Sequence, residues 1–111
     1  MLGMLNDTER YHGQVKAYFV TEICTGKKVG FSTMTTDRVD GYAILDGAAV
    51  HPAYRGKGIY KMMASKRLDD AKKDGLEYTI IHALKNTSAP ICKRIGFREI
   101  CQIDFYGYKI N

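Results

Sequence analysis

The chain has 111 residues, enough for one small domain, and we expect residues 1–111 to form a single domain. Apolar residues make up 45% and charged residues 26% of the sequence, a balance typical of globular proteins that excludes a disordered chain. No stretch approaches the roughly 18–20 apolar residues that a membrane-spanning helix needs, so no membrane partner is expected.

The net charge of +5 is concentrated in the second half of the chain. Residues 51–98 carry eleven Lys and Arg side chains against four Asp and Glu, whereas the rest of the chain carries six against eight. Such a concentration indicates either a polyanionic partner, such as a phosphorylated cofactor or nucleic acid, or a lysine-rich helix face in contact with solvent.

The cysteines and histidines argue against a disulfide framework and against a metal site. The three cysteines form no C-x-x-C pair, and the three histidines are scattered singly along the chain. No signal peptide is visible at the start of the sequence. We therefore expect a cytoplasmic protein, in a reducing compartment, without a bound metal.

Three strands are predicted first. Residues 14–24 alternate in hydrophobicity with a period of two, which is typical of a half-buried strand. A short turn leads to a second strand over residues 28–36, and Asp40-Gly41 forms a tight turn into a third, apolar strand over residues 42–50. Three such strands in succession predict an antiparallel meander.

The pattern then becomes helical. Residues 57–74 carry apolar side chains at helical spacing, and residues 78–84 form a short apolar run that is typical of a buried parallel strand. A second, shorter helix is predicted to begin near residues 86–88 and to end at Gly96. The remaining residues, 97–110, are predicted to be rich in strand.

This order of elements predicts an α/β fold of the α+β type, with a mixed, mainly antiparallel sheet and flanking helices. A strand–helix–strand unit normally places its two strands parallel, so residues 42–50 and 78–84 are expected to form a parallel joint. Ligands in α/β sheets bind at the carboxyl ends of strands, which places the expected site near Val50.

A glycine-rich segment joins the third strand to the first helix. It reads Arg55-Gly56-Lys57-Gly58-Ile59-Tyr60. Its glycines allow the backbone to wrap closely around a ligand, and the free N–H groups and dipole of the helix suit a pyrophosphate. The spacing fits neither a Walker P-loop nor the G-x-G-x-x-G fingerprint, and a plain tight turn is the alternative interpretation of the segment alone.

The surrounding sequence resembles the GNAT superfamily of N-acetyltransferases. Its acyl-CoA-binding motif is similar to Val50-His51-Pro52-Ala53-Tyr54-Arg55-Gly56-Lys57-Gly58-Ile59, and a second family element recurs in Asn86-Thr87-Ser88-Ala89-Pro90-Ile91-Cys92-Lys93-Arg94-Ile95-Gly96-Phe97. The predicted element order matches as well, and the resemblance covers roughly residues 14–110. It implies an acyl-CoA N-acyltransferase-like fold with splayed parallel strands, in a short form that lacks the usual N-terminal strand and two helices.

The resemblance implies acetyl-CoA as the cosubstrate. Backbone groups of residues 48–50 are expected to pair with the pantetheine arm as with an added strand, and amides of residues 55–60 to hold the pyrophosphate. Asn86 is expected to reach the pantetheine, with a simple helix cap as its alternative role. The expected cofactor-binding residues are Ala48, Ala49, Val50, Arg55, Gly56, Lys57, Gly58, Ile59, Tyr60 and Asn86.

Two positions depart from the family pattern. Tyr60 stands where relatives usually have Gly or Ala, so its side chain is expected to turn away from the phosphates into the apolar face of the helix. Cys92 stands where many relatives have a tyrosine that protonates the departing CoA thiolate. A thiol could perform this step, and a small buried apolar side chain is the alternative role of Cys92.

Acetyl transfer to an amine requires a base for the amine proton and a donor for the developing oxyanion. The family analogy makes the Val50 N–H the oxyanion donor. Asp46 is the only carboxylate on the strand before the motif, and His82 lies on the predicted parallel strand. Each could instead be structural, Asp46 facing solvent and His82 facing the core. The expected catalytic residues are Asp46, Cys92 and His82.

Three function classes follow from these patterns. An N-acetyltransferase that moves an acetyl group from acetyl-CoA to a primary amine of a small molecule or protein is favoured by the two linked motifs. A non-catalytic acyl-CoA-binding domain, or a subunit completed by another chain, is favoured by Cys92 and the missing N-terminal elements. A basic nucleic-acid-binding module is the third class and the least favoured, because the basic residues 51–75 include only two aromatic side chains and lack a stacking platform, so nucleic acid is not an expected partner.

The short N-terminal segment also predicts self-association. Without the family's opening strand, residues 14–24 lie at or near a sheet edge, and the apolar floor of the sheet lacks the helices that usually cover it. Exposed edges and large apolar patches tend to be buried by a partner. We therefore expect a homodimer, or a partner chain that completes the sheet.

Overall fold

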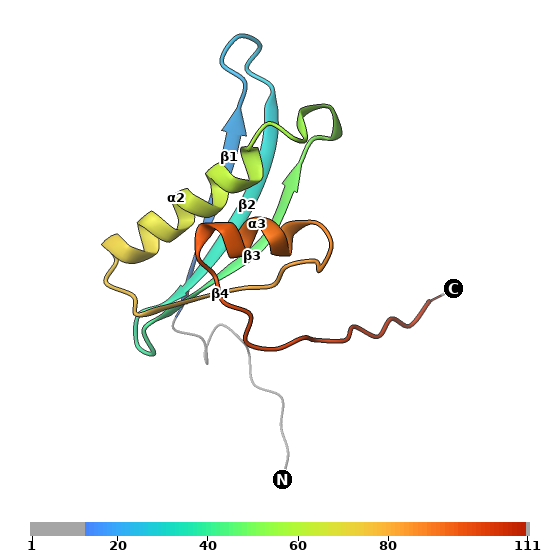
Figure 1. Cartoon of the computed structure of the whole chain (residues 1–111). Coiled ribbons are helices and arrows are strands. Elements are labelled where there is room, and N and C mark those ends of the chain that lie inside the picture. Colours follow the sequence, from blue (N-terminus) through green and yellow to red (C-terminus); the bar gives the residue numbers. More distant parts are fainter. Residues whose placement is uncertain (1–12, 111) are drawn as a thin grey trace.

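The computed structural model describes residues 13–110. Four strands form one sheet in the order β1-β2-β3-β4, and both α-helices lie on the same face of it (Figure 1). A single 3₁₀ turn, η1, separates the sheet from the first α-helix. The elements are β1 (Gly13–Thr21), β2 (Lys28–Asp37), β3 (Tyr42–Val50), η1 (Pro52–Tyr54), α2 (Ile59–Lys73), β4 (Tyr78–Ile81) and α3 (Ser88–Ile95).

The sheet confirms the predicted mixed topology. β1 pairs with β2 and β2 with β3 in antiparallel fashion, whereas β3 and β4 are parallel. The parallel pairing is short, because it joins only residues 42–45 of β3 to residues 78–81 of β4. Beyond Leu45 the two strands are no longer paired, which is the splay that the family resemblance implies.

The core lies between the sheet and α2. Met34, Ala43, Leu45 and Ala71 are buried together, and they bring side chains of β2, β3 and α2 into contact. The buried residues of α2 recur at helical spacing, so one stripe of the helix faces the sheet. The central strands and α2 therefore form the fixed base from which the carboxyl end of β3 projects.

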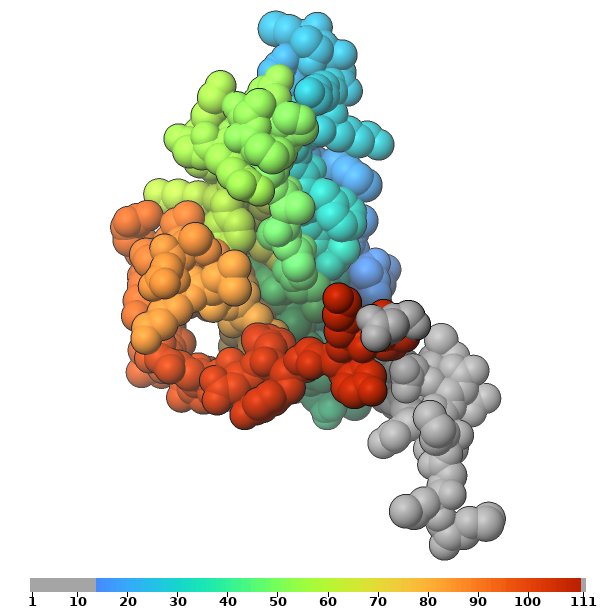
Figure 2. Space-filling model, turned by 90° about the vertical axis from the view of Figure 1, so that its right-hand side faces the viewer, coloured from blue at the N-terminus to red at the C-terminus, as the bar shows by residue number. Residues whose placement is uncertain are grey.

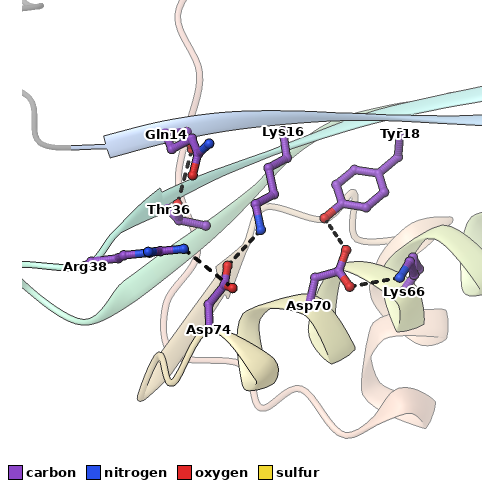
Figure 3. Close-up of polar contacts among 8 residues, drawn as sticks. All are labelled: Gln14, Lys16, Tyr18, Thr36, Arg38, Lys66, Asp70 and Asp74. Carbon is purple, nitrogen blue, oxygen red and sulfur yellow. Dashed lines mark hydrogen bonds and ion pairs between the residues drawn. The ribbon is translucent and has the colours of Figure 1, made fainter.

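The carboxyl-terminal half of α2 is tied to β1 by polar side chains (Figure 3). Lys16 Nζ lies 2.8 Å from Asp74 Oδ2, and the Tyr18 hydroxyl donates to Asp70 Oδ2 at 2.7 Å. The opposite side of β1 is open, with Val15 and Phe19 exposed to 65% and 54%. The more polar side of this strand is therefore the packed one, because its long side chains reach the helix.

Two predicted strand segments are wrong. β4 ends at Ile81 rather than at residue 84, so His82 lies outside the strand. Residues 97–110 contain no strand, and residues 98–110 are exposed along an arm that leaves the body of the molecule (Figure 1) and points toward the viewer in Figure 2. An alternating sequence forms a strand only where a neighbouring strand supplies hydrogen bonds, and within residues 13–110 no strand pairs with either segment.

No helix within residues 13–110 is both long enough and apolar enough to cross a membrane. The same residues contain no cluster of three His, Cys, Asp or Glu side chains that could hold a metal ion.

Candidate functional site

The carboxyl end of β3 offers a free backbone edge. His51 N–H donates to Val29 O at 2.8 Å, which makes His51 and Val29 a hydrogen-bonded pair of the β2–β3 ladder. Antiparallel pairs alternate, so Val50 opposite Gly30 is a non-hydrogen-bonded pair, and its N–H and C=O point away from β2. They face the side on which β4 has ended.

The same alternation applies to the two residues before Val50. Ala48, opposite Ser32, also turns its backbone groups away from β2, whereas Ala49 directs its groups toward β2. Of the three residues predicted to pair with pantetheine, Ala48 and Val50 therefore present free donors and acceptors. Ala49, which lies between them, pairs with Phe31 of β2 and holds this part of β3 to the sheet.

The glycine-rich segment bends around the start of α2. Gly56 and Gly58 have φ angles of 78° and 80°, in the left-handed region that other residues rarely adopt. Gly58 is the N-cap of α2 and makes no side-chain capping bond, and the first turn of α2 contains no acidic residue. The amides of this turn are thus left for an anion, with the exposed basic side chains of Arg55 and Lys57 beside them.

The side chain of Tyr60 turns away from the glycine-rich segment, as predicted, and reaches α3. Its hydroxyl lies 3.5 Å from Cys92 Sγ, and either atom can be the donor. Burial, followed by the contact with Cys92, raises the pKa of Tyr60 to about 12, so the phenol stays protonated at neutral pH. Cys92 itself is buried, with 3% of its surface exposed.

The candidate catalytic residues do not converge. Asp46 follows the buried Leu45 and projects from the opposite face of the sheet, where Thr35 Oγ1 donates to Asp46 Oδ2 at 2.5 Å. Cys92 lies on the helix-covered face. His82 is exposed in the loop after β4, not in the core. Asp46 and His82 are therefore separate candidates for the base, and they do not act as a contacting pair.

Asn86 is not a helix cap. The N-cap of α3 is Thr87, and the loop before α3 is tied by Ser88 Oγ, which accepts from the Leu84 N–H at 2.8 Å. Asn86 is exposed in that loop. Its side-chain amide is therefore accessible to a ligand.

An open groove of about 360 Å³ runs beside the end of β3. Phe19 and Phe31 line it with their rings 5.1 Å apart, and Ala49 and Val50 form part of its wall. The lining residues include no carboxylate. The groove thus places a mainly apolar surface next to the free backbone edge.

Arg67 is a residue of this region that the sequence analysis missed. It is 0% exposed, and it donates to backbone carbonyls at the point where β3 leaves β4. The available signal was its position, because Arg67 falls within the apolar stripe of α2 rather than on the solvent side with Lys66.

A scan of protein families matches residues 3–97 to the acetyltransferase (GNAT) family. No curated protein matches the chain. Solved structures share its fold at low identity. An acetyltransferase of Trypanosoma brucei has a TM-score of 0.74 at 19% identity, over 90% of this chain and 72% of that one.

Two further structures show the same fold. The aminoglycoside N-acetyltransferase AAC(6')-Iy in complex with CoA has a TM-score of 0.68 at 21% identity, over 86% of this chain and 77% of that one. A ribosomal-protein-alanine N-acetyltransferase from Brucella melitensis biovar Abortus 2308 has a TM-score of 0.60 at 22% identity, over 87% and 70% of the two chains.

Proposed function

The chain belongs to the GNAT acetyltransferase family, and we propose that it transfers an acetyl group from acetyl-CoA to a primary amine of a small molecule or protein. One structural observation carries the proposal. The parallel strands part after Leu45 and Ile81, and the free edge of Ala48 and Val50 lies on the side that they leave open. A pantetheine arm, which has amide groups at intervals, fits such an edge as an added strand.

The pyrophosphate and the pantetheine arm of acetyl-CoA fit different parts of this site. The pyrophosphate fits the first turn of α2, where two left-handed glycines keep the backbone open and no acidic side chain opposes an anion. Asn86, which is exposed in the loop before α3, would contact the pantetheine. One structure of a related fold, AAC(6')-Iy, is in complex with CoA, which supports CoA as the ligand class.

The acetyl group would then lie near Val50. The Val50 N–H would donate to the thioester carbonyl oxygen as negative charge develops on it. The amine nitrogen would attack the carbonyl carbon, and the carbon–sulfur bond would break. Asp46 would accept the amine proton, through water if necessary, because Asp46 and the groove beside Val50 lie on the same side of the sheet.

The departing thiolate requires a proton. We propose Cys92 for this step, with its thiol beside the protonated Tyr60 hydroxyl at 3.5 Å. His82 is the second candidate base, since its exposed position in the loop after β4 leaves its imidazole accessible.

Calorimetric titration with acetyl-CoA, followed by a thiol-release assay over a panel of amines, tests this function. Saturable binding and amine-dependent thiol release are expected. Binding without release on any amine would contradict catalysis and leave the second candidate, a non-catalytic acyl-CoA-binding domain. The burial of Cys92 is the observation that favours this second candidate, because a buried thiol has no direct path to solvent.

We also propose that the chain self-associates in the cytoplasm. Among the described residues β1 is an edge strand, and the sheet face opposite α2 exposes Val15, Phe19 and Phe31. A second copy paired along the free edge of β1 would satisfy the backbone groups of that edge, while the groove lined by Phe19 and Phe31 would stay open to substrate. The free cysteines Cys24 and Cys101 are exposed, which suits a reducing compartment. Sedimentation at micromolar concentration tests the dimer, and a monodisperse monomer would contradict it.

A further inference from the structure

Arg67 is an unusual residue for the core of this fold. It is the largest of the fully buried side chains, and within residues 13–110 no carboxylate lies within ion-pair distance of its guanidinium. A buried charge without a counter-ion is costly and is retained only where its hydrogen bonds are needed. The atoms to which Arg67 donates therefore indicate its role.

Those atoms are backbone carbonyl oxygens. Nη1 donates to Thr33 O and to Asp46 O, both at 3.0 Å, and Nε donates to Met63 O at 3.3 Å within α2 itself. Thr33 lies on β2 and Asp46 on β3. One nitrogen of Arg67 thus joins the two strands at a single point, across the face covered by α2.

That point is a β-bulge. Ser32 pairs with Ala48, but Met34 pairs with Leu45, so two residues of β3, Asp46 and Gly47, stand opposite Thr33 alone. A bulge interrupts the ladder and leaves carbonyl groups without their usual donors. Arg67 supplies donors to the two carbonyls at this interruption.

The bulge also decides which backbone groups line the site. If the register of Leu45 opposite Met34 continued without the extra residue, Gly47 would stand opposite Ser32 and Ala49 opposite Gly30. A shift by one residue exchanges the two faces and the two edges of a strand. Ala49 would then direct its N–H toward the gap, and Val50 would direct its N–H toward β2.

We infer that Arg67 is a positioning residue, which holds the bulge and thereby aims the backbone groups of Ala48 and Val50 into the gap between β3 and β4. The inference names a residue that sets the geometry of the proposed acyl-CoA site, and its value for catalysis rests on that proposed function. A guanidinium suits the role, because its planar fork donates in several fixed directions at once. Lysine has a single nitrogen without this fixed fork.

The experiment compares Arg67→Met with Arg67→Lys and with a control, Ala71→Gly. Ala71 is also fully buried on α2 but lies one turn further along and makes no hydrogen bond to the bulge, so glycine there destabilises the same helix. NMR measures the cross-strand contact between the Hα atoms of Ser32 and Ala48, which are close only in the bulged register, and the amide exchange of residues 46–50. Titration with CoA measures affinity.

For Arg67→Met we expect loss of the Ser32–Ala48 contact, at least tenfold faster amide exchange confined to residues 46–50, and at least tenfold weaker CoA binding. Arg67→Lys is expected to give an intermediate result, and Ala71→Gly to keep the contact and bind CoA within twofold of the parent. If Arg67→Met does not fold, Arg67→Lys decides alone, by whether its faster exchange is confined to residues 46–50.

The inference is overturned if the Arg67 variants keep the Ser32–Ala48 contact and exchange residues 46–50 no faster than Ala71→Gly does. Failure of the proposed function gives a different result. A parent protein that does not bind CoA at millimolar concentration removes the proposed function, while the contact and exchange measurements still decide whether Arg67 holds the bulge.

Discussion

The two ends of α2 are held to the sheet in different ways. At its carboxyl end, Asp70 and Asp74 bond to Tyr18 and Lys16 of β1 through side chains that are partly open to solvent (Figure 3). At the middle of the helix, the contact is made by the buried Arg67 with backbone carbonyls of β2 and β3, and at its amino end the helix begins at a glycine without a side-chain cap. Side-chain pairs attach the carboxyl end of the helix to β1, whereas its middle and its amino end contact or border the backbone of the proposed CoA site.

This difference predicts that changes at the amino end alter ligand binding and changes at the carboxyl end alter stability. Exposed ion pairs contribute about 0–1 kcal/mol each, so the carboxyl end can vary at small cost. Where Arg67 contacts the sheet, a shift of the β3 register by one residue would exchange the backbone groups that face the proposed ligand.

The largest effect is expected for Gly58→Asp. The substitution places a non-glycine residue at φ 80°, which costs about 1–2 kcal/mol, and a negative charge at the proposed pyrophosphate site. We expect acetyl-CoA affinity to fall about a hundredfold by calorimetry, which is about 2.7 kcal/mol. Gly26→Asp is the matched control, because Gly26 has φ 73° in the β1–β2 turn. Equal affinity of Gly58→Asp and Gly26→Asp would contradict a phosphate site.

A smaller effect is expected for Asp46→Asn. If Asp46 accepts the amine proton, turnover falls at least about tenfold and the dependence of rate on pH flattens, while acetyl-CoA affinity is unchanged. Asp69→Asn, an exposed carboxylate on α2, is the control. Kinetics unchanged over roughly pH 6–9 would exclude Asp46, and His82→Ala would be the next variant to measure.

At the carboxyl end, Tyr18→Phe removes one hydrogen bond to Asp70 and leaves the ring in place. We expect the free energy of unfolding to fall by about 1 kcal/mol in urea, with acetyl-CoA affinity within twofold of the parent. A marked loss of affinity in this variant would show that the two ends of α2 are coupled and would break the comparison.

The smallest effect concerns the stability of the protein at low pH. Hydrogen bonds from Lys66 and Tyr18 lower the pKa of Asp70 from 3.8, and the Lys16 ammonium lowers the pKa of Asp74. Lowered folded-state pKa values stabilise the protein above the unfolded value and lose that effect as pH falls through the folded value. We expect melting temperature to decline below about pH 4, and less steeply in Asp70→Asn. A parallel decline in both proteins would contradict this origin.

The sequence predicted the sheet order, the parallel joint and the glycine-rich turn, because hydrophobic period and glycine placement are local signals. It did not predict the bulge or the role of Arg67, since both depend on how α2 crosses two strands distant in sequence. The strand predicted over residues 97–110 is wrong because alternation cannot supply a pairing partner. The prediction that His82 lies on a strand is wrong for the same reason, because β4 ends at Ile81, where its pairing with β3 ends.

An NMR titration of the labelled protein with CoA tests the central claim most directly. We predict saturable shifts of the amides of Ala48, Val50 and residues 56–60, with the β1–β2 turn and the carboxyl end of α2 unchanged. The amide of Ala49, which faces β2, should shift less than those of its two neighbours. Absence of saturable shifts at millimolar CoA, or shifts gathered at the carboxyl end of α2, would contradict the account.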